Sequence, residues 1–223
     1  MLGADARLAL TYVPAADRGA LEALLLIDAA MSDVVRTTHE AQLGPIRLAW
    51  WRERLEDLDS QSPAPAEPRL QAIARELIPR GVEGRTIAKL EAGWLCMFDP
   101  FPWGVETAEA IWFRGNVLFG IGAKALGRAD ERIQDAGGLW ALVDAARHCS
   151  DEGSRSMLID RARIFAPGLR STCFPSRLRP LSMLAALAMR DCRRGEPFEP
   201  EGTPGRALAM LAHRLSGRLP RRS

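Results

Sequence analysis

Residues 43–56 read LGPIRLAWWRERLE, and this stretch says most about the fold. A rotation of about 100° per residue gives one broad apolar stripe, as in an amphipathic helix, made of Ile46, Trp50, Trp51, Leu55 and Leu58. Arg47 and Arg54 fall near the middle of that stripe. A charged group in such a position needs an anionic partner unless its head reaches water. The stretch therefore predicts a core-facing helix with two arginines that require an explanation.

Helical spacing also dominates the rest of the chain, and strand-like alternation is nearly absent. The sequence contains one tyrosine and few runs of β-branched residues, which disfavours a sheet. We expect an all-α domain of roughly eight to ten helices. The expected helices cover residues 14–35, 43–58, 69–77, 84–97, 107–126, 132–149, 154–165, 179–194 and 204–215, with a loop at 167–175.

The bulk composition is that of one globular domain spanning residues 1–223. Apolar residues make up 47% of the chain and charged residues 26%, and the net charge of +2 is too small to indicate a nucleic-acid partner. Residues 60–68 (SQSPAPAEP) predict a proline-rich surface loop, and residues 216–223 predict a basic, flexible tail.

The cysteine pattern and the hydropathy of the chain predict its surroundings. The four cysteines are scattered, none forms a C-x-x-C pair, and only three histidines are present, so we expect no metal site from them. A reducing cytoplasm is the natural compartment for such a chain. No apolar stretch approaches the roughly 20 residues that span a bilayer. We expect a soluble cytoplasmic protein without a transmembrane segment, for which peripheral membrane contact is left open.

Asp28 lies on an apolar face of the helix expected over residues 14–35. A carboxylate in that position is either paired or close to something that it binds. Asp33 points about 140° away from Asp28, and one turn separates it from Arg36, so an i,i+3 ion pair is feasible.

Two interpretations of Arg47 and Arg54 follow. A short turn near residues 44–45 would lay their helix antiparallel to the preceding one, so that Asp28 meets Arg47 or Arg54 in a structural ion pair. Alternatively, the two arginines cradle an anionic ligand such as a diphosphate, because a guanidinium binds phosphate oxygens with two parallel hydrogen bonds. Asp28, Asp33, Arg47 and Arg54 are the candidate ligand-binding or diphosphate-binding residues.

The helix expected over residues 107–126 combines large aromatic side chains with glycines. Aromatic residues at helical spacing are usually part of the core. We therefore expect core positions for Trp50 and Trp51 of residues 43–56 and for Trp112, Phe113 and Phe119 of this helix. Gly115 costs stability in a helix interior, so it indicates either close approach of a neighbouring helix or a cavity that is kept open.

Three segments together resemble the squalene/phytoene synthase family: residues 8–14 (LALTYVP), the long apolar helix up to Val35, and residues 43–52 (LGPIRLAWWR). Within that family, the chain looks most like a branch that includes a mitochondrial complex I assembly factor. The resemblance implies an isoprenoid-synthase-like helical bundle around a central cavity. Under that expectation, Trp51, Trp112, Gly115 and Phe119 become the candidate cavity-lining residues.

The enzymes of that family hold Mg²⁺ with two acidic motifs, D-D-x-x-D and D-x-x-x-D or D-x-x-E-D. Carboxylates at such spacings meet on one helix face, and the ions stabilise a departing diphosphate. The first motif would fall on residues 32–36 (SDVVR), where only Asp33 is acidic, and the second on residues 148–152 (HCSDE), where His148 replaces the leading acid. A three-metal site needs more carboxylates than these.

We therefore assign no catalytic residue. A cofactor, Mg²⁺, is expected only if a transferase activity is retained. We expect a non-catalytic binding or assembly factor. The alternatives are a prenyl-diphosphate transferase with a reduced Mg²⁺ site and a lipid-binding or isoprenoid-binding protein. The expected partners are correspondingly a protein, a prenyl diphosphate or a lipid-like ligand, and not nucleic acid.

Overall fold

The computed structural model describes residues 1–219 except 39, 41, 61–62 and 170–172. The expectation of an all-α chain is confirmed: the described part consists of helices and their connections, with one isolated bridge between Cys173 and Arg218 instead of a sheet. Within this part, each helix falls short of the length and apolarity that crossing a membrane requires.

The chain order of the helices agrees closely with the sequence pattern. The α-helices are α1 (Ala4–Thr11), α2 (Ala15–Thr37), α3 (Leu43–Glu56), α4 (Pro68–Glu76), α5 (Gly84–Ala88), α6 (Leu90–Leu95), α7 (Val105–Ala125), α8 (Glu131–His148), α9 (Glu152–Leu169), α10 (Arg179–Arg194) and α11 (Pro204–Ser216). Short 3₁₀ turns, η1 (Asp57–Asp59), η2 (Ile78–Arg80), η3 (Cys96–Phe98) and η4 (Ser176–Leu178), connect some of them.

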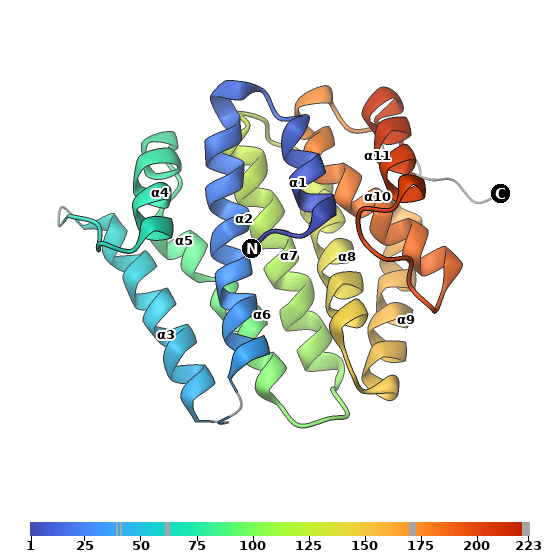
Figure 1. Cartoon of the computed structure of the whole chain (residues 1–223), viewed down its shortest axis with the longest axis horizontal. Helices are drawn as coiled ribbons and strands as arrows, with labels where there is room; N and C mark the ends of the chain where they lie inside the picture. The colour runs from blue at the N-terminus through green and yellow to red at the C-terminus, as the bar shows by residue number, and fades with distance from the viewer. Residues whose placement is uncertain (39, 41, 61–62, 170–172, 220–223) are drawn as a thin grey trace.

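The helix α2 lies near the middle of the bundle, as its apolar composition predicts. It packs against α1, α3, α4, α6 and α7, while α3 and α11 lie at opposite edges of the molecule (Figure 1). Ala20, Leu24 and Ile27 are completely buried on α2. Burial on several sides stabilises this helix much more than intrinsic helix propensity does.

The helices α7 and α8 approach each other most closely at two glycines. A Cβ atom on Gly115 would collide with the carbonyl oxygen of Gly137, and one on Gly137 would collide with that of Gly115. The close approach of helices, rather than an open cavity, is therefore the reason for glycine at position 115. The pair Gly137–Gly138 does not interrupt α8, which runs continuously to His148.

The structure differs from the sequence expectation in three elements. The helix α1 was not expected, yet it buries Ala9 and Leu10 against the core. The helix expected over residues 84–97 is divided into α5, α6 and η3. The helix α9 continues through Pro167 to Leu169, where we expected a loop, because burial of Ala166 and Leu169 compensates for the hydrogen bond that proline cannot donate.

Residues 217–219 are held more firmly than a flexible tail would be. The backbone N–H of Phe174 donates to the carbonyl oxygen of Gly217 over 2.8 Å, and Leu219 is buried. The remainder of the predicted tail, residues 220–223, lies outside the described residues, as do residues 61–62 of the predicted proline-rich loop.

Candidate functional site

A cavity of about 500 Å³ lies among α1, α2, α6, α8 and α10. This volume falls within the range of roughly 300–1,000 Å³ that is usual for sites of small organic ligands. Its large apolar lining side chains are Leu25, Trp94, Met97, Phe101, Trp103, Trp140, Val143, Leu184 and Leu187. Its acidic and basic lining side chains are Asp5, Asp28, Asp33, Arg36, Asp144, Arg147, His148, Asp191, Glu201 and Arg206.

Asp28 of α2 is a buried acid on the cavity wall. Arg114 Nη1 donates to both of its carboxylate oxygens over 3.0 Å, and Trp94 Nε1 donates to Oδ1 over 2.8 Å. Burial raises the pKa of the Asp28 carboxyl, while the nearby charge of Arg114 and the hydrogen bond from Trp94 oppose that rise. The predicted pairing of this carboxylate is thus present, with a partner from α7.

Arg114 itself is fully buried between two tryptophan rings. Its guanidinium carbon lies 3.8 Å from the ring centroid of Trp94 and 5.6 Å from that of Trp140. Among the described residues, its Nε and Nη2 atoms have no hydrogen-bond acceptor, although Asp144 Oδ2 lies 3.6 Å from Nη2. The aromatic faces and the two carboxylates compensate for a charge that would otherwise be very costly to bury.

Asp33 and Asp144 contribute carboxylates from α2 and α8, respectively. Arg36 Nη2 donates to Asp33 Oδ1 over 2.5 Å, which is the i,i+3 ion pair that the spacing predicts. Asp144 lies near Arg114 and also near His148, whose Nδ1 is 3.7 Å from Asp144 Oδ1. Both carboxylates are therefore placed next to a basic side chain.

A second charged cluster joins α1, α8, α10 and α11 on the cavity wall. Arg206 donates from Nε to Asp5 Oδ2 over 2.7 Å and from Nη1 to Asp191 Oδ1 over 2.7 Å. Arg147 Nη1 donates to Asp191 Oδ2 over 2.9 Å. Because these charges compensate one another within a buried network, their first role is to tie four helices together.

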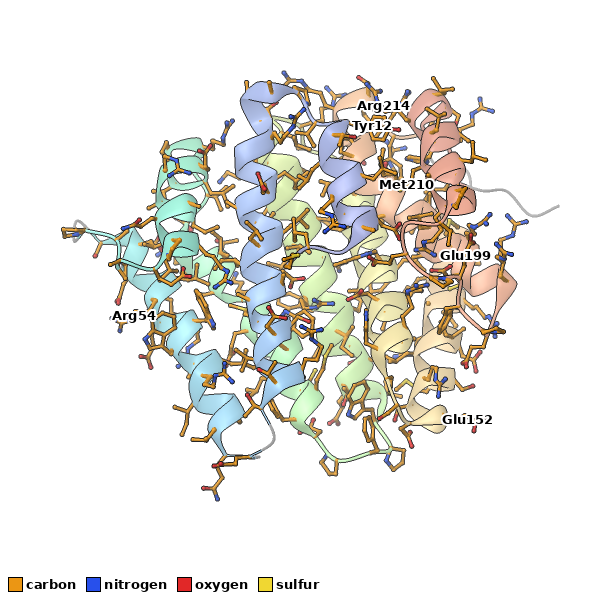
Figure 2. All side chains as sticks on the ribbon, viewed as in Figure 1. Tyr12, Arg54, Glu152, Glu199, Met210 and Arg214 are labelled. Carbon is orange, nitrogen blue, oxygen red and sulfur yellow. The ribbon has the colours of Figure 1, made fainter. Side chains whose placement is uncertain are left out.

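Arg47 and Arg54 do not meet Asp28. Arg47 Nη1 donates to Thr38 Oγ1 over 2.7 Å, and Arg54 Nη1 lies 3.1 Å from Asp57 Oδ2. Figure 2 labels Arg54 on α3, at the edge of the molecule. Leu55, on the same predicted stripe as the two arginines, is buried, because α3 packs on the core through Gly44, Leu48, Trp51 and Leu55, while Arg47 reaches solvent and Arg54 is half-buried. The expected ion pair of Asp28 with Arg47 or Arg54 is therefore wrong, and neither arginine lines the cavity.

Trp51, Trp112, Gly115 and Phe119 do not line the cavity either. Trp51 is buried against the guanidinium of Arg69, whose carbon lies 6.0 Å from its ring centroid. Trp112 stacks on Phe165 with ring centroids 3.8 Å apart, and Phe119 is completely buried. These aromatic side chains thus belong to the packed core and to helix interfaces. The expectation that Trp50 and Phe113 lie in the core is wrong, since they are 43% and 47% exposed.

The segment of residues 148–152 divides between the cavity and the surface. His148, Cys149 and Ser150 line the cavity. Asp151 instead accepts hydrogen bonds from the N–H and the hydroxyl of Ser154, both over 2.7 Å, at the start of α9. Asp151 is thus occupied at the start of α9, and the acid that reaches the cavity from this region is Asp144.

No family model, no curated protein and no solved structure matches this chain. The donor set of the cavity is a poor fit for the metal ions that the family resemblance implies. Mg²⁺ prefers carboxylates that face phosphate oxygens and water, whereas Asp28 and Asp33 accept hydrogen bonds from arginines. Within the described part of the chain, no three His, Cys, Asp or Glu side chains are grouped in a way that could hold a metal ion.

Proposed function

We propose that this chain is a squalene/phytoene synthase-like protein with an isoprenoid-synthase-like bundle, and that it acts as a non-catalytic binding or assembly factor. In this proposal, the cavity holds one apolar, isoprenoid-type ligand without a metal ion. A protein partner would then recognise the loaded form.

One observation carries the proposal: five aspartates on the cavity wall each lie within 4 Å of a guanidinium group. The nitrogen–oxygen distances are 3.0 Å for Asp28–Arg114, 2.5 Å for Asp33–Arg36, 3.6 Å for Asp144–Arg114, 2.7 Å for Asp5–Arg206 and 2.7 Å for Asp191–Arg206. Metal ions would have to displace these cations before they could hold a diphosphate. A cavity with compensated acids is better suited to a neutral ligand.

The remaining lining of the cavity supports the apolar character of that ligand. Trp103 and Trp140 contribute aromatic surface to the cavity wall, and Leu184 and Leu187 contribute aliphatic surface. Removing apolar surface from water contributes about 25 cal/mol per Å², which favours a hydrocarbon chain at this site. Ser32 also lines the cavity, and its hydroxyl would orient a terminal hydroxyl of the ligand.

A transferase with a reduced Mg²⁺ site is the second candidate, and it also has a specific observation in its favour. Asp28 of α2 and Asp144 of α8 line the same cavity, and the charge of Asp144 helps to raise the pKa of Asp28, after the larger effect of burial. Two carboxylates from facing helices are the arrangement that family enzymes use. Activity would require Asp28 to give up part of its pairing with Arg114.

A pair of assays separates the two candidates. The proposal predicts saturable binding of farnesol that is equal in Mg²⁺ and in EDTA, measured by the fluorescence of the cavity tryptophans. It also predicts no pyrophosphate release from farnesyl diphosphate with Mg²⁺ above a blank without protein. If pyrophosphate is released and Asp144→Asn abolishes that release, the proposal of a binding protein is wrong and the protein is a transferase.

A further inference from the structure

The helix α11 presents an unpartnered apolar stripe to solvent. Leu208, Leu211 and Leu215, at i, i+3 and i+7, have exposed fractions of 66%, 43% and 75%. The residues by which α11 packs on the bundle, Met210 and His213, are buried and lie about 180° away on a helical projection. The three leucines therefore point directly away from the molecule, and Figure 1 shows α11 at its edge.

The surroundings of this stripe are basic. The segment of residues 204–223 contains five arginines and neither Asp nor Glu. Arg206 is engaged in buried ion pairs with Asp5 and Asp191. Arg214 lies on α11, where Figure 2 labels it, and Arg218 lies just after the end of that helix. An α-helix with leucines on one side and arginines beside them is the usual composition of helices that lie in a membrane interface.

A groove between α10 and α11 extends the basic surface. It has a volume of about 320 Å³ and is lined by Arg190, Arg193 and Arg218 together with small residues and His213. Glu199 accepts hydrogen bonds from the hydroxyl of Thr203 and from Arg190 and Arg194, and these contacts lower its pKa to about 2. Glu199 is thus engaged by two arginines of α10, and Arg218 adds positive charge on the α11 side of the groove.

The exposed apolar stripe on α3 provides an internal comparison. Ile46 is 64% exposed, much like Leu208. However, α3 and η1 carry Glu53, Glu56 and Asp57 beside their arginines, and Arg54 pairs with Asp57. The α3 surface is charge-balanced, whereas α11 and the residues that follow it carry arginines and no acid. Charge complementarity therefore selects α11 as the surface for a uniformly anionic partner.

We propose that α11 docks flat on an anionic phospholipid bilayer, with Leu208, Leu211 and Leu215 inserted between the acyl chains. Arg214 and Arg218 then contact lipid phosphates. A phosphate accepts paired hydrogen bonds from a guanidinium, so arginine suits this role better than lysine. This docking is independent of what the cavity binds.

Vesicle sedimentation tests this docking directly. The protein should sediment with vesicles of phosphatidylcholine that contain roughly 30% phosphatidylglycerol, and it should not sediment with vesicles of pure phosphatidylcholine. Leu208→Glu with Leu215→Glu should reduce the bound fraction at least tenfold. Arg214→Gln with Arg218→Gln should also reduce it and should weaken its dependence on salt.

The matched control is Ile46→Glu on α3, which should bind within about twofold of the unchanged protein. Circular dichroism and the melting temperature of every variant verify folding. Equal loss of binding in Ile46→Glu would overturn the assignment to α11, as would retention of pure phosphatidylcholine vesicles to the same extent. If the protein does not bind vesicles but forms a dimer that Leu208→Glu and Leu215→Glu dissociate, the membrane-docking proposal is wrong. The partner of the α11 leucines is then a second copy of the chain.

Discussion

Replacement of Asp28 by Asn tests whether this carboxylate is a structural counter-ion. The change removes the charge that faces Arg114, which is fully buried, but leaves an oxygen that can still accept the hydrogen bond from Trp94. Stranding a buried charge typically costs about 3–5 kcal/mol. Asp144 remains 3.6 Å from Arg114 with a side chain that is 24% exposed, so we expect the lower end, about 3 kcal/mol.

Urea unfolding at pH 7 measures this loss. With a slope of about 3 kcal/mol per M, the unfolding midpoint should fall by about 1 M. Asp33→Asn is the control, because its ion pair with Arg36 is exposed and should contribute less than about 1 kcal/mol. A second variant, Asp28→Asn with Arg114→Met, removes the stranded charge and should recover most of the lost stability. An unchanged midpoint for Asp28→Asn, or additive losses in the double variant, would refute the reasoning.

Three further predictions concern single elements of the bundle. Burial lowers the pKa of His213 from 6.5 to about 4, so the unfolded chain takes up a proton first as the pH falls below 6.5. Between pH 7 and pH 5, the unchanged protein should therefore lose about 2 kcal/mol more stability than His213→Gln. Urea unfolding at each pH measures this difference. Gly115→Ala should destabilise the fold by about 1–3 kcal/mol because its methyl group meets the backbone of α8. In Gly120→Ala the methyl group meets only the flexible end of a glutamine side chain, so this variant should be as stable as the unchanged protein or more stable. The melting temperatures of the two variants test the difference. Arg47→Ala and Arg54→Ala should each change stability by no more than about 0.5 kcal/mol, and a loss of several kcal/mol would mean that α3 is packed differently.

The hydrogen bonds of His213 are compatible with the neutral ring that burial favours. Its Nδ1 lies 3.0 Å from the carbonyl oxygen of Arg218, which can only accept, so Nδ1 carries the proton. Nε2 then accepts from the hydroxyl of Ser182 over 2.7 Å. The neutral ring satisfies both partners, and a second proton on Nε2 would displace the one that Ser182 donates.

Much of the fold could be predicted because the local pattern and the packing agree. The bounds of α10 and the burial of α2 follow from helical periodicity alone. Pro167 shows the limit of such reasoning, since its local preference ends a helix whereas burial of the following turn continues it. The helix α1 is short and has a weak pattern, so its contacts with α2 and α10 had to be seen in three dimensions.

The candidate site was predictable only in part. The face of α2 on which Asp28 lies shows that it is buried and needs a partner, but which arginine reaches it depends on how α2, α3 and α7 are arranged. Arg114 carries a usable signal, because it is the one charged residue between Glu109 and Lys124 on an apolar helix. The i,i+4 spacing of Asp144 and His148 could also have indicated that Asp144 is part of the site. The sequence around Trp94 shows only an aromatic residue and does not indicate its contact with Asp28.

The most direct test of the proposed function is a calorimetric titration of farnesol into the protein in EDTA. The unchanged protein should bind one equivalent saturably. Ala29→Phe, which places an aromatic ring on the cavity wall of α2, should weaken binding at least tenfold, while Ala15→Phe at the exposed start of the same helix should have no effect. Absence of saturable binding, or equal binding by Ala29→Phe and the unchanged protein, would contradict the assignment of the cavity to an apolar ligand.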